Sequence, residues 1–390
     1  ATTVSFTVAG PSITKSGTIT AMATCIGTAS ASQTFTITGS GLTNNIIITS
    51  PTGYEIATTS GGTYSSSITL TQSSGSVTNT SIFVRITAAA TSAPAGTISI
   101  TSTGAIAQTI TIPASTINAL PTISIGSNTV LSGPIGTTNI TGSAYPATTG
   151  TWVSSNTAVG TITGTNSTTG VVTGLKNGIT KITYTNNNGC VTSSLFRVGT
   201  GKVLWYVTNT AETTPNADVT LNTIPSAINQ SLTGDTIIVY EGTYKDKIDY
   251  GSKNLILASR YLLDLDTTHI SRTKIDGTGV AQNNDWWDPF IKQTNFTSDT
   301  SLQKFIGFKV MNTQGLSIMF NGGVIRNNIF TNNVTKTYDL SVIRVAGVKV
   351  ENNMFDANKG SFTILAQPFN QGDHAWTYIN NNVFKNQSLV

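Results

Sequence analysis

Residues 1–117 alternate apolar and polar side chains with the two-residue period of a β-strand. Aliphatic or aromatic residues stand two positions apart in four segments: Phe35/Ile37, Ile46/Ile48, Ile82/Val84/Ile86 and Ile98/Ile100. Such alternation predicts strands that are buried on one face only. Turn clusters such as Gly39-Ser40-Gly41 separate the strands at the spacing of a sandwich. Residues 1–117 are therefore predicted to form one antiparallel β-sandwich.

A second set of short strands begins around Pro121 and continues to residue 200. Its apolar residues again cluster in strand-length segments: Thr151–Val153, Gly170–Thr173 and Ile179–Tyr184. Trp152 is predicted to fill the core between two sheets, because a large aromatic side chain in such a strand is more often buried than a ligand platform. Residues 118–200 are therefore predicted to form a second sandwich.

Charge divides the chain near residue 200. Only six charged side chains precede that point, although 10% of all residues are charged: Lys15, Glu55, Arg85, Lys176, Lys181 and Arg197. Low charge and abundant β-branched residues exclude helical bundles, and a hydrophobic content of 38% argues against disorder. The net charge of +4 is not clustered, so nucleic acid is not an expected partner. No run approaches the roughly 20 apolar residues of a transmembrane helix.

Two stretches of the first half resemble known repeats. The first is similar to an Ig-like repeat of secreted and cell-surface proteins of Bacteroidetes on these residues: Thr24–Ser30, Gln33–Ile37, Gly41-Leu42 and Pro51–Ile56. The second resembles a bacterial Ig-like (group 2) domain on these residues: Trp152, Ser154–Asn156, Ala158-Val159, Gly170–Gly174 and Lys181–Asn186. The resemblances imply two tandem Ig-like β-sandwiches that act as spacers or adhesive modules.

The two cysteines lie in different predicted domains. In relatives of the second domain, a Cys often occurs near the position of Leu131 and could pair with the Cys of an Asn-Gly-Cys segment. Because Leu131 occupies the partner position here, Cys190 is expected to be unpaired or to pair outside its own sandwich. A Cys25–Cys190 bridge would require the two sandwiches to fold together and is the less favoured alternative. Two cysteines so far apart predict neither a disulfide scaffold nor a zinc site.

Residues 221–232 carry the clearest helical pattern in the chain. Their apolar residues recur at i, i+3, i+4 and i+8: Ile224, Ala227, Ile228 and Leu232. Pro225 stands near the start, where a missing N–H is tolerated, and Thr223 can cap the helix. Gly234-Asp235 then interrupts the chain before the strand-like segment Thr236–Tyr240.

An Asn-Asn-x-Phe motif recurs three times in the last third of the chain. Its copies, with a weaker one before them, are these: Ile306–Val310, Ile325–Phe330, Val350–Phe355 and Ile379–Phe384. The phenylalanines are 22, 25 and 29 residues apart, which fits one stacked coil per copy. Asn residues at recurring corners are expected to adopt left-handed conformations and to form side-chain ladders between coils.

The helix and the Gly234–Tyr244 segment after it resemble the start of a right-handed parallel β-helix of the pectate-lyase-like class. In that class a short helix caps the first coil. The resemblance implies that residues 201–390 are the N-terminal part of a parallel β-helix. We expect the coils to continue beyond Val390, because a terminal coil without a cap would expose its interior. The expected fold class is therefore all-β, with three domains at 1–117, 118–200 and 201–390.

Two groups of side chains in the second half are candidates for chemistry. The weak catalytic candidates form the densest ionisable group, in which two carboxylates would share one face of a strand: Asp264, Asp266, His269 and Arg272. A solvated strand and turn is the plainer interpretation of this group. The candidates for glycan contact lie in an irregular loop: Asp285, Trp286, Trp287 and Asp288. Aromatic faces there could stack on sugars, or one Trp could pack on the coil below.

These features favour a secreted, cell-surface bacterial protein that acts as an adhesin or stalk. Type IX secretion cargo and gliding-motility adhesins of Bacteroidetes are the versions that the resemblances imply. The alternatives are a polysaccharide lyase or glycoside hydrolase with its site on the β-helix, and a non-catalytic glycan-binding protein. No metal or cofactor is expected, except Ca²⁺ if the chain is a lyase. Expected partners are an extracellular polysaccharide or surface and the secretion machinery of the outer membrane.

Overall fold

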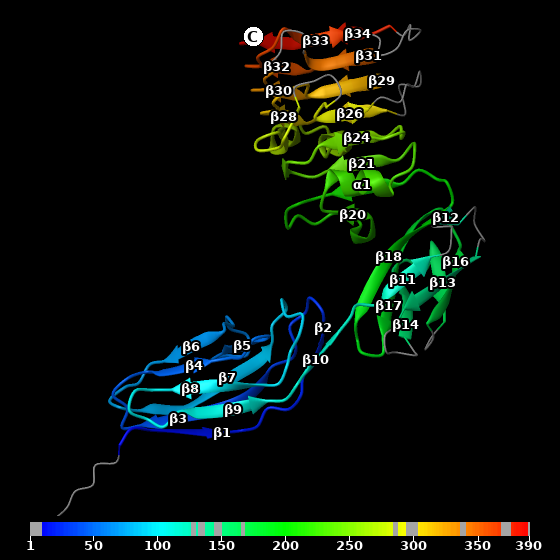
Figure 1. The fold of residues 1–390 in the computed structure, drawn as a ribbon. Helices are drawn as coiled ribbons and strands as arrows, with labels where there is room; N and C mark the ends of the chain where they lie inside the picture. Colours follow the sequence, from blue (N-terminus) through cyan, green and yellow to red (C-terminus); the bar gives the residue numbers. More distant parts are fainter. Residues whose placement is uncertain are drawn as a thin grey trace, which may run out of the picture. The chain divides into compact units, whose positions relative to one another are not determined.

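The computed structural model describes residues 10–125, 130–131, 137–143, 150–164, 168–283, 288–293, 303–335, 341–367 and 376–388. It contains two compact units. The first comprises residues 1–131, 135–175 and 181–196, and the second comprises residues 132–134, 176–180 and 197–390. Strands dominate both units (Figure 1).

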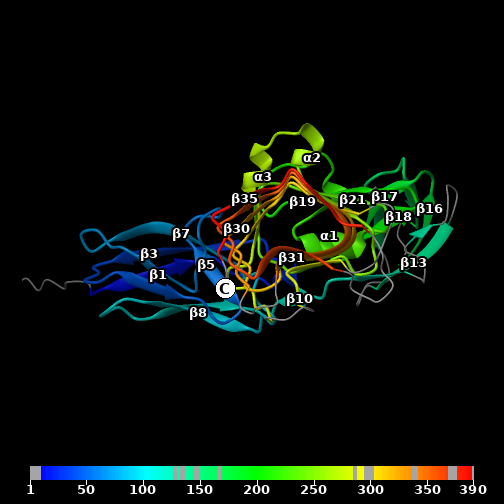
Figure 2. The ribbon, with the colours of Figure 1, turned by 90° about the horizontal axis from the view of Figure 1, so that it is seen from above.

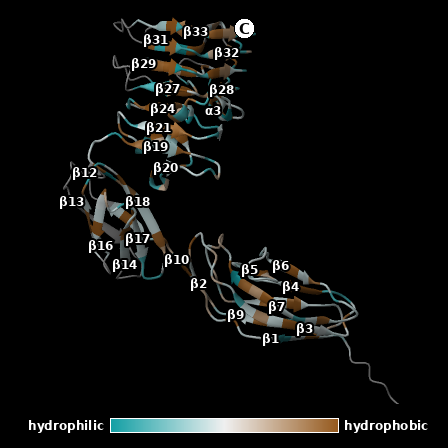
Figure 3. Ribbon diagram, turned by 180° about the vertical axis from the view of Figure 1, so that it is seen from behind, coloured by the Kyte–Doolittle hydropathy of each residue, from teal (hydrophilic) through white to brown (hydrophobic). Residues whose placement is uncertain are grey.

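The first sandwich consists of two antiparallel four-stranded sheets. One sheet has the order β1 (Ser12–Ser16), β3 (Gln33–Ser40), β7 (Val77–Ile86) and β5 (Tyr54–Ala57). The other has the order β6 (Ser67–Leu70), β4 (Ile46–Thr49), β8 (Gly96–Thr101) and β9 (Gln108–Ile112). Every alternating apolar residue named above is at most 1% exposed, and all of them belong to one core. The predicted antiparallel sandwich is therefore confirmed, and Figure 3 shows its hydrophobic residues along the strands.

The second sandwich also has two four-stranded sheets. The first has the order β11 (Thr122–Ile125), β13 (Thr137–Ser143), β16 (Thr169–Gly174) and β15 (Gly160–Thr163). The second has the order β12 (Val130–Leu131), β18 (Val191–Val198), β17 (Gly178–Asn186) and β14 (Gly150–Ser154). Trp152 is 9% exposed, and its ring centroid lies 4.4 Å from that of Tyr184. The prediction that Trp152 is a core residue is confirmed.

A disulfide joins Cys25 to Cys190, with Cα atoms 5.6 Å apart and a sequence separation of 165. The expectation that Cys190 is unpaired is therefore wrong, and the less favoured alternative, a Cys25–Cys190 bridge, is the one that the structure confirms. The reason lies in β10 (Thr116–Asn118), which pairs in parallel with β2 (Ala23–Cys25) and places Asn118 opposite Cys25. Asn188 then donates from its side-chain amide to Asn118 at 3.3 Å, so the Asn188–Cys190 turn lies beside β2.

The stacked unit, residues 197–390, consists of two parallel sheets. The larger sheet contains β20 (Thr220–Leu221), β19 (Leu204–Val207), β21 (Thr236–Val239), β24 (Ile256–Ser259), β27 (Lys304–Ile306), β29 (Ile318–Arg326), β26 (Ile291–Gln293), β23 (Ile248–Asp249), β31 (Ser341–Glu351), β33 (Phe362–Ala366) and β34 (Tyr378–Asn380). The smaller has the order β22 (Gly242–Tyr244), β25 (Thr273–Asp276), β28 (Lys309–Met311), β30 (Ile329–Thr331), β32 (Met354–Asp356) and β35 (Val383–Lys385). Figure 2 looks along this stack, in which successive strands superpose. The arrangement is compatible with the expected parallel β-helix.

The predicted helix is present as α1 (Ile224–Gln230), which follows the short 3₁₀ helix η1 (Ala217–Val219). Thr223 caps α1 as predicted, because its hydroxyl accepts a hydrogen bond from the backbone N–H of Ser226 at 3.2 Å. Ile224, Ala227 and Ile228 are buried. The helix is shorter than its apolar pattern, since Ser231 already has an extended backbone.

The two asparagines of each repeated motif have different roles. The first Asn of each pair turns the chain in the left-handed region, with φ values of 57°, 55° and 51°: Asn327, Asn352 and Asn381. The second Asn of each pair forms a ladder between coils: Asn328, Asn353 and Asn382. The side-chain amide of Asn328 donates to the side-chain oxygen of Asn353, and that of Asn353 donates to the side-chain oxygen of Asn382, both at 3.0 Å. Beside the ladder, the phenylalanine rings stack with centroids 4.8 and 5.1 Å apart: Phe330, Phe355 and Phe384. Both predicted roles of the asparagines are confirmed.

A buried ion pair stabilises the beginning of the stacked unit. The guanidinium of Arg197 donates to both carboxylate oxygens of Asp235, at 2.7 and 2.8 Å. Asp235 also accepts hydrogen bonds from the indole of Trp205 at 2.9 Å and from the backbone N–H groups of Val203 and Leu232. Burial alone raises the pKa of Asp235, but these hydrogen bonds outweigh it and hold that pKa below its ordinary value.

Candidate functional site

The predicted catalytic group lies on two short helices rather than on a strand, so that part of the prediction is wrong. Helix α2 (Tyr261–Asp264) and helix α3 (Thr268–Arg272) connect β24 to β25 and project from the stack (Figure 2). The local sequence explains this difference. Asp264 accepts from the backbone N–H of Asp266, Asp266 accepts from that of Thr268, and such side-chain bonds favour turns over strands.

His269 is the centre of this group. Its Nδ1 atom lies 2.8 Å from Oε1 of Glu241, and its Nε2 atom lies 3.0 Å from Oδ2 of Asp264. The residue is only 7% exposed. Both ring nitrogens therefore face carboxylates, and a neutral imidazole has a single N–H with which to bond them. Glu241 was missed in the sequence because it lies 28 residues from His269 and joins it only through the fold.

Two arginines complete the charged network around His269. Arg260 donates to Glu212 at 2.8 Å and lies 3.7 Å from Asp264, while Arg272 lies 3.6 Å from Glu241. The backbone N–H of Asp266, together with His269, holds the pKa of Asp264 below its ordinary value. A general acid requires the opposite shift. The geometry is that of a clamp that holds α2 and α3 on the stack, and a catalytic role for this group stays a prediction.

Asp266 takes no part in the contacts of His269 with carboxylates. It is exposed, and the backbone N–H and the hydroxyl of Thr268 hold its pKa below the ordinary value. The structure therefore brings together Asp264 and His269 and leaves Asp266 in the turn between the helices. The Arg272 side chain is 62% exposed, and its guanidinium lies on the Glu241 side of the network.

The predicted glycan loop is described only in part. Asp285, Trp286 and Trp287 lie outside the described residues. Asp288 accepts from Lys247 and from the backbone N–H of Asn283, both at 2.5 Å. Its carboxylate therefore already has two partners, and the role of the tryptophans stays a prediction.

A groove of about 520 Å³ lies on the outer face of the sheet that contains β4. We call it the Ile47 groove, and its lining residues are Asn44, Asn45, Ile47, Thr69, Thr101, Ser102 and Thr103. Alternation in β4 turns Ile46 and Ile48 into the core, so Ile47 points outward and is 49% exposed. The three consecutive isoleucines were the sequence signal for this exposed position, and the sequence reasoning missed it.

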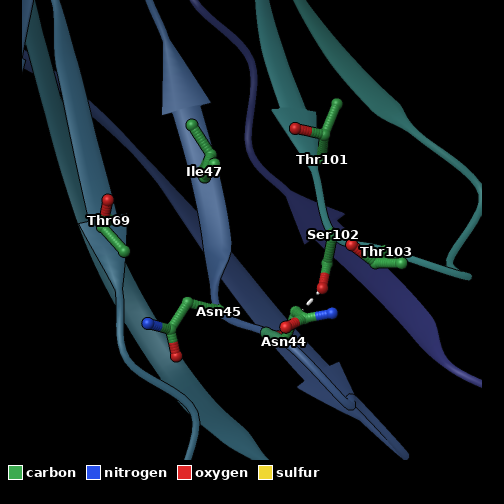
Figure 4. Close-up of a pocket in the computed structure, with 7 residues that line it drawn as sticks. All are labelled: Asn44, Asn45, Ile47, Thr69, Thr101, Ser102 and Thr103. Carbon is green, nitrogen blue, oxygen red and sulfur yellow. Dashed lines mark hydrogen bonds between the residues drawn. The ribbon is translucent and has the colours of Figure 1, made fainter.

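Strand register places hydroxyl groups on both sides of Ile47. Thr69 in β6 and Thr101 in β8 are both its direct partners across the sheet. Figure 4 shows Ile47 between them, with the two asparagines at one end of the groove. The hydroxyl of Ser102 donates to the backbone carbonyl of Asn44 at 2.9 Å, which fixes that end. The lining contains hydroxyls, carboxamides and one aliphatic side chain, and it carries no charge.

The hydroxyl-bearing face extends beyond the groove. The next row across the same sheet consists of exposed Ser and Thr side chains, one from each strand: Ser67, Thr49, Ser99 and Thr109. Neighbouring strands lie about 4.8 Å apart, and side chains on one face repeat about every 6.7 Å along a strand. The groove is thus one end of a regular hydroxyl-bearing surface, and the ammonium of Lys15 bonds to the Thr109 carbonyl at the edge of that surface.

A smaller groove of about 370 Å³ lies beside α3 on the stacked unit. Thr267 and Ile270 line one wall, and the remaining lining residues belong to the repeated motifs: Asn327, Asn328, Ile329, Asn352 and Met354. The clamp around His269 positions this wall. Among the described residues, no three His, Cys, Asp or Glu side chains form a group that could hold a metal ion. The described helices are all too short or too polar to cross a membrane.

No family model and no curated protein matches this chain. A C-terminal 282-residue fragment of intimin, solved with the intimin-binding domain of its translocated receptor, is 19% identical over 48% of this chain and 63% of the fragment, with a TM-score of 0.27. Domains 4 and 5 of the S-layer protein SbsC are 20% identical over 27% of this chain and 66% of theirs, with a TM-score of 0.17.

The fibronectin(III)-like modules of Clostridium thermocellum CbhA are 13% identical over 48% of this chain and 93% of theirs, with a TM-score of 0.22. This chain covers less than two thirds of the intimin fragment and of the SbsC domains. At such identities and TM-scores the likeness carries no argument about activity or partners. The structure itself defines a modular, mostly β protein with two β-sandwiches and a parallel stack.

Proposed function

We propose that this chain is a secreted bacterial surface protein, an adhesin or stalk, that binds a neutral glycan through the Ile47 groove. The observation that carries the proposal is an uncharged, hydroxyl-lined surface around one exposed isoleucine. Sugar hydroxyls exchange hydrogen bonds with Thr, Ser and Asn side chains, and an aliphatic side chain can cover the C–H face of a pyranose ring. The groove volume lies within the range of small-molecule sites.

The disulfide supports an extracytoplasmic location, because such bonds persist in oxidising compartments. A bacterial origin in Bacteroidetes, type IX secretion and a role in gliding motility are finer parts of the proposal and rest on the sequence resemblances. The expected division into domains at 1–117, 118–200 and 201–390 belongs to the proposal as well.

A right-handed parallel β-helix is our proposal for residues 201–390. Its support is the parallel register of every strand pair in the two stacked sheets, together with the ladder of Asn328, Asn353 and Asn382. Such a stack is suited to a stalk, because each coil is hydrogen-bonded to the coils on either side.

The glycan proposal is tested with the whole chain on an array of neutral and acidic polysaccharides, followed by titration calorimetry. Ile47→Asp and Thr101→Lys should each weaken binding of a neutral glycan at least tenfold. The matched control is Thr38→Lys, an exposed threonine on the other sheet of the same sandwich, which should leave the affinity unchanged. Affinity should also be insensitive to salt, because the groove carries no charge.

Four outcomes would contradict the proposal. Absence of binding to any neutral glycan would refute the proposal. Binding that persists in both groove variants would show that the binding site lies elsewhere. Loss of binding in Trp286→Ala with Trp287→Ala, but not in Ile47→Asp, would assign binding to the tryptophan loop. A reducing-end assay in Ca²⁺ belongs to the same experiment, since turnover of any polysaccharide would favour the lyase or glycosidase alternative.

A further inference from the structure

The Cys25–Cys190 bridge closes a covalent loop that contains most residues of the first unit. Residues 26–189 lie between its two ends. This stretch contains seven of the eight strands in the two sheets of the first sandwich, β1 being the exception. Every residue that lines the Ile47 groove also lies inside the loop.

Tension along a polypeptide follows its shortest covalent path. Without the bridge, a pull between the two ends of this chain would pass through every residue from 26 to 189. With the bridge, the pull passes from Cys25 to Cys190 directly, and the residues between them carry no end-to-end load. We propose that the bridge is a force bypass, which keeps the first sandwich and its groove folded while the chain is under tension.

The elements outside the loop show where load would act. On the N-terminal side, β1 is held to β3 by five residue pairs, from Ser12 opposite Ser40 to Ser16 opposite Thr36. On the C-terminal side, the path runs along β18 to Arg197, which the buried Asp235 holds in the stacked unit. Release of β1 from β3 is therefore the first mechanical event expected in the first sandwich, and after it strands β3 to β9 lie outside the covalent load path.

This inference deepens the proposed function, because an adhesin or stalk has to hold its ligand under load. Its test needs no ligand, so failure of the glycan proposal and failure of the force bypass are separate results. The experiment stretches single whole chains between handles at their two ends and measures the contour length at full extension. The compared samples are the wild type, the wild type with a reductant, and the Cys25→Ser/Cys190→Ser variant.

The separation of 165 residues, at about 3.3–3.6 Å per extended residue, corresponds to roughly 540–590 Å of chain. The oxidised wild type should be shorter than the double variant by that amount at full extension. Reductant should lengthen the wild type equally and leave the double variant unchanged. Full-extension length does not depend on how well a variant folds, so poor folding of the double variant cannot imitate this result. Equal lengths of oxidised wild type and variant, or two titratable thiols in the native protein, would overturn the proposal.

Discussion

The first sandwich and the stacked unit are both built of β-strands, yet they place polar side chains in opposite locations. Among the described residues of 10–118, Ser30 is the one buried polar side chain. The stacked unit buries many, and these are its largest group: Asn321, Asn328, Asn333, Asn353 and Asn358. Hydroxyl groups of the sandwich instead lie on its outer faces, as around Ile47.

The difference follows from where each architecture turns its chain. Antiparallel strands turn at the ends of the sheets, where water can satisfy the backbone groups. Stacked coils turn beneath the next coil, so their backbone groups need partners from inside the protein. Asn353 supplies such partners, since its side chain bonds to Asn328, to Asn382 and to the carbonyl of Ile325. A sandwich can therefore keep its polar residues for binding, whereas a stack uses many of them for its own structure.

The sharpest test of this contrast is Asp235→Asn, which removes one charge from the buried ion pair with Arg197. We expect the free energy of unfolding of the stacked unit to fall by about 3–5 kcal/mol, because a buried guanidinium loses its counter-charge. Urea denaturation followed by tryptophan fluorescence measures it, since Trp205 donates to Asp235. The partly exposed Asp246 provides the control, Asp246→Asn, and equal effects of the two variants would refute the argument.

The same ion pair predicts a dependence on pH. The pKa of Asp235 is lowered in the folded state, so its stabilising effect is complete above the ordinary aspartate pKa of about 3.9. Stability should be lost as the pH falls through the lower, folded-state pKa. In Asp235→Asn this part of the acid sensitivity should disappear, and an unchanged acid profile would show that other groups cause it.

Removal of the disulfide should have the next largest effect, and it should be confined to the first unit. Cys25→Ser with Cys190→Ser is expected to lower the free energy of unfolding by about 2–5 kcal/mol, since the long loop restricts the unfolded chain. Hydrogen exchange with mass spectrometry should show faster exchange in β2 and β10 and unchanged exchange in the stacked unit. Faster exchange throughout both units would contradict this separation.

Asn353→Ala compares the two roles of the repeated asparagines. It should cost at least about 1–3 kcal/mol, because buried N–H and carbonyl groups in adjacent coils lose their partners. The neighbouring exposed Asn352 turns the chain at a φ of 55°, and Ala357 already has a φ of 53°. Asn352→Ala should therefore cost no more than about 1–2 kcal/mol. Thermal unfolding measures both, and a larger loss for Asn352→Ala would reverse the assigned roles.

The smallest expected effect belongs to the ion pair of the first sandwich. Arg85 donates to Glu55 at 2.7 Å and lies 3.7 Å over the ring of Tyr64. Both charged side chains are partly exposed, so Arg85→Gln should cost about 1 kcal/mol or less. Urea denaturation measures the loss in the free energy of unfolding, which is compared with the loss in Asp235→Asn. A loss as large as that of the buried pair would show that the sandwich also depends on charged contacts.

The sequence predicted features whose cause lies within a few neighbouring residues. Period-two alternation identified the core of the first sandwich, and Thr223 with Pro225 identified α1. The Asn-Asn-x-Phe repeat predicted left-handed turns and a ladder. Where two local patterns compete, prediction was poorer, and the side chains of Asp264 and Asp266 formed turns in a segment expected to be a strand.

Only the tertiary structure decided which distant residues meet. Cys25 and Cys190 are joined because β10 pairs with β2, and no local pattern encodes that parallel pairing. Glu241 reaches His269 because the chain returns one coil later, and Thr69 and Thr101 flank Ile47 through strand register. The physical reason is that side-chain periodicity fixes which face a residue takes, whereas contacts across a loop depend on how the whole chain closes. The sequence therefore determined the faces and turns of this protein, and the fold determined its bridge, its clamp and its groove.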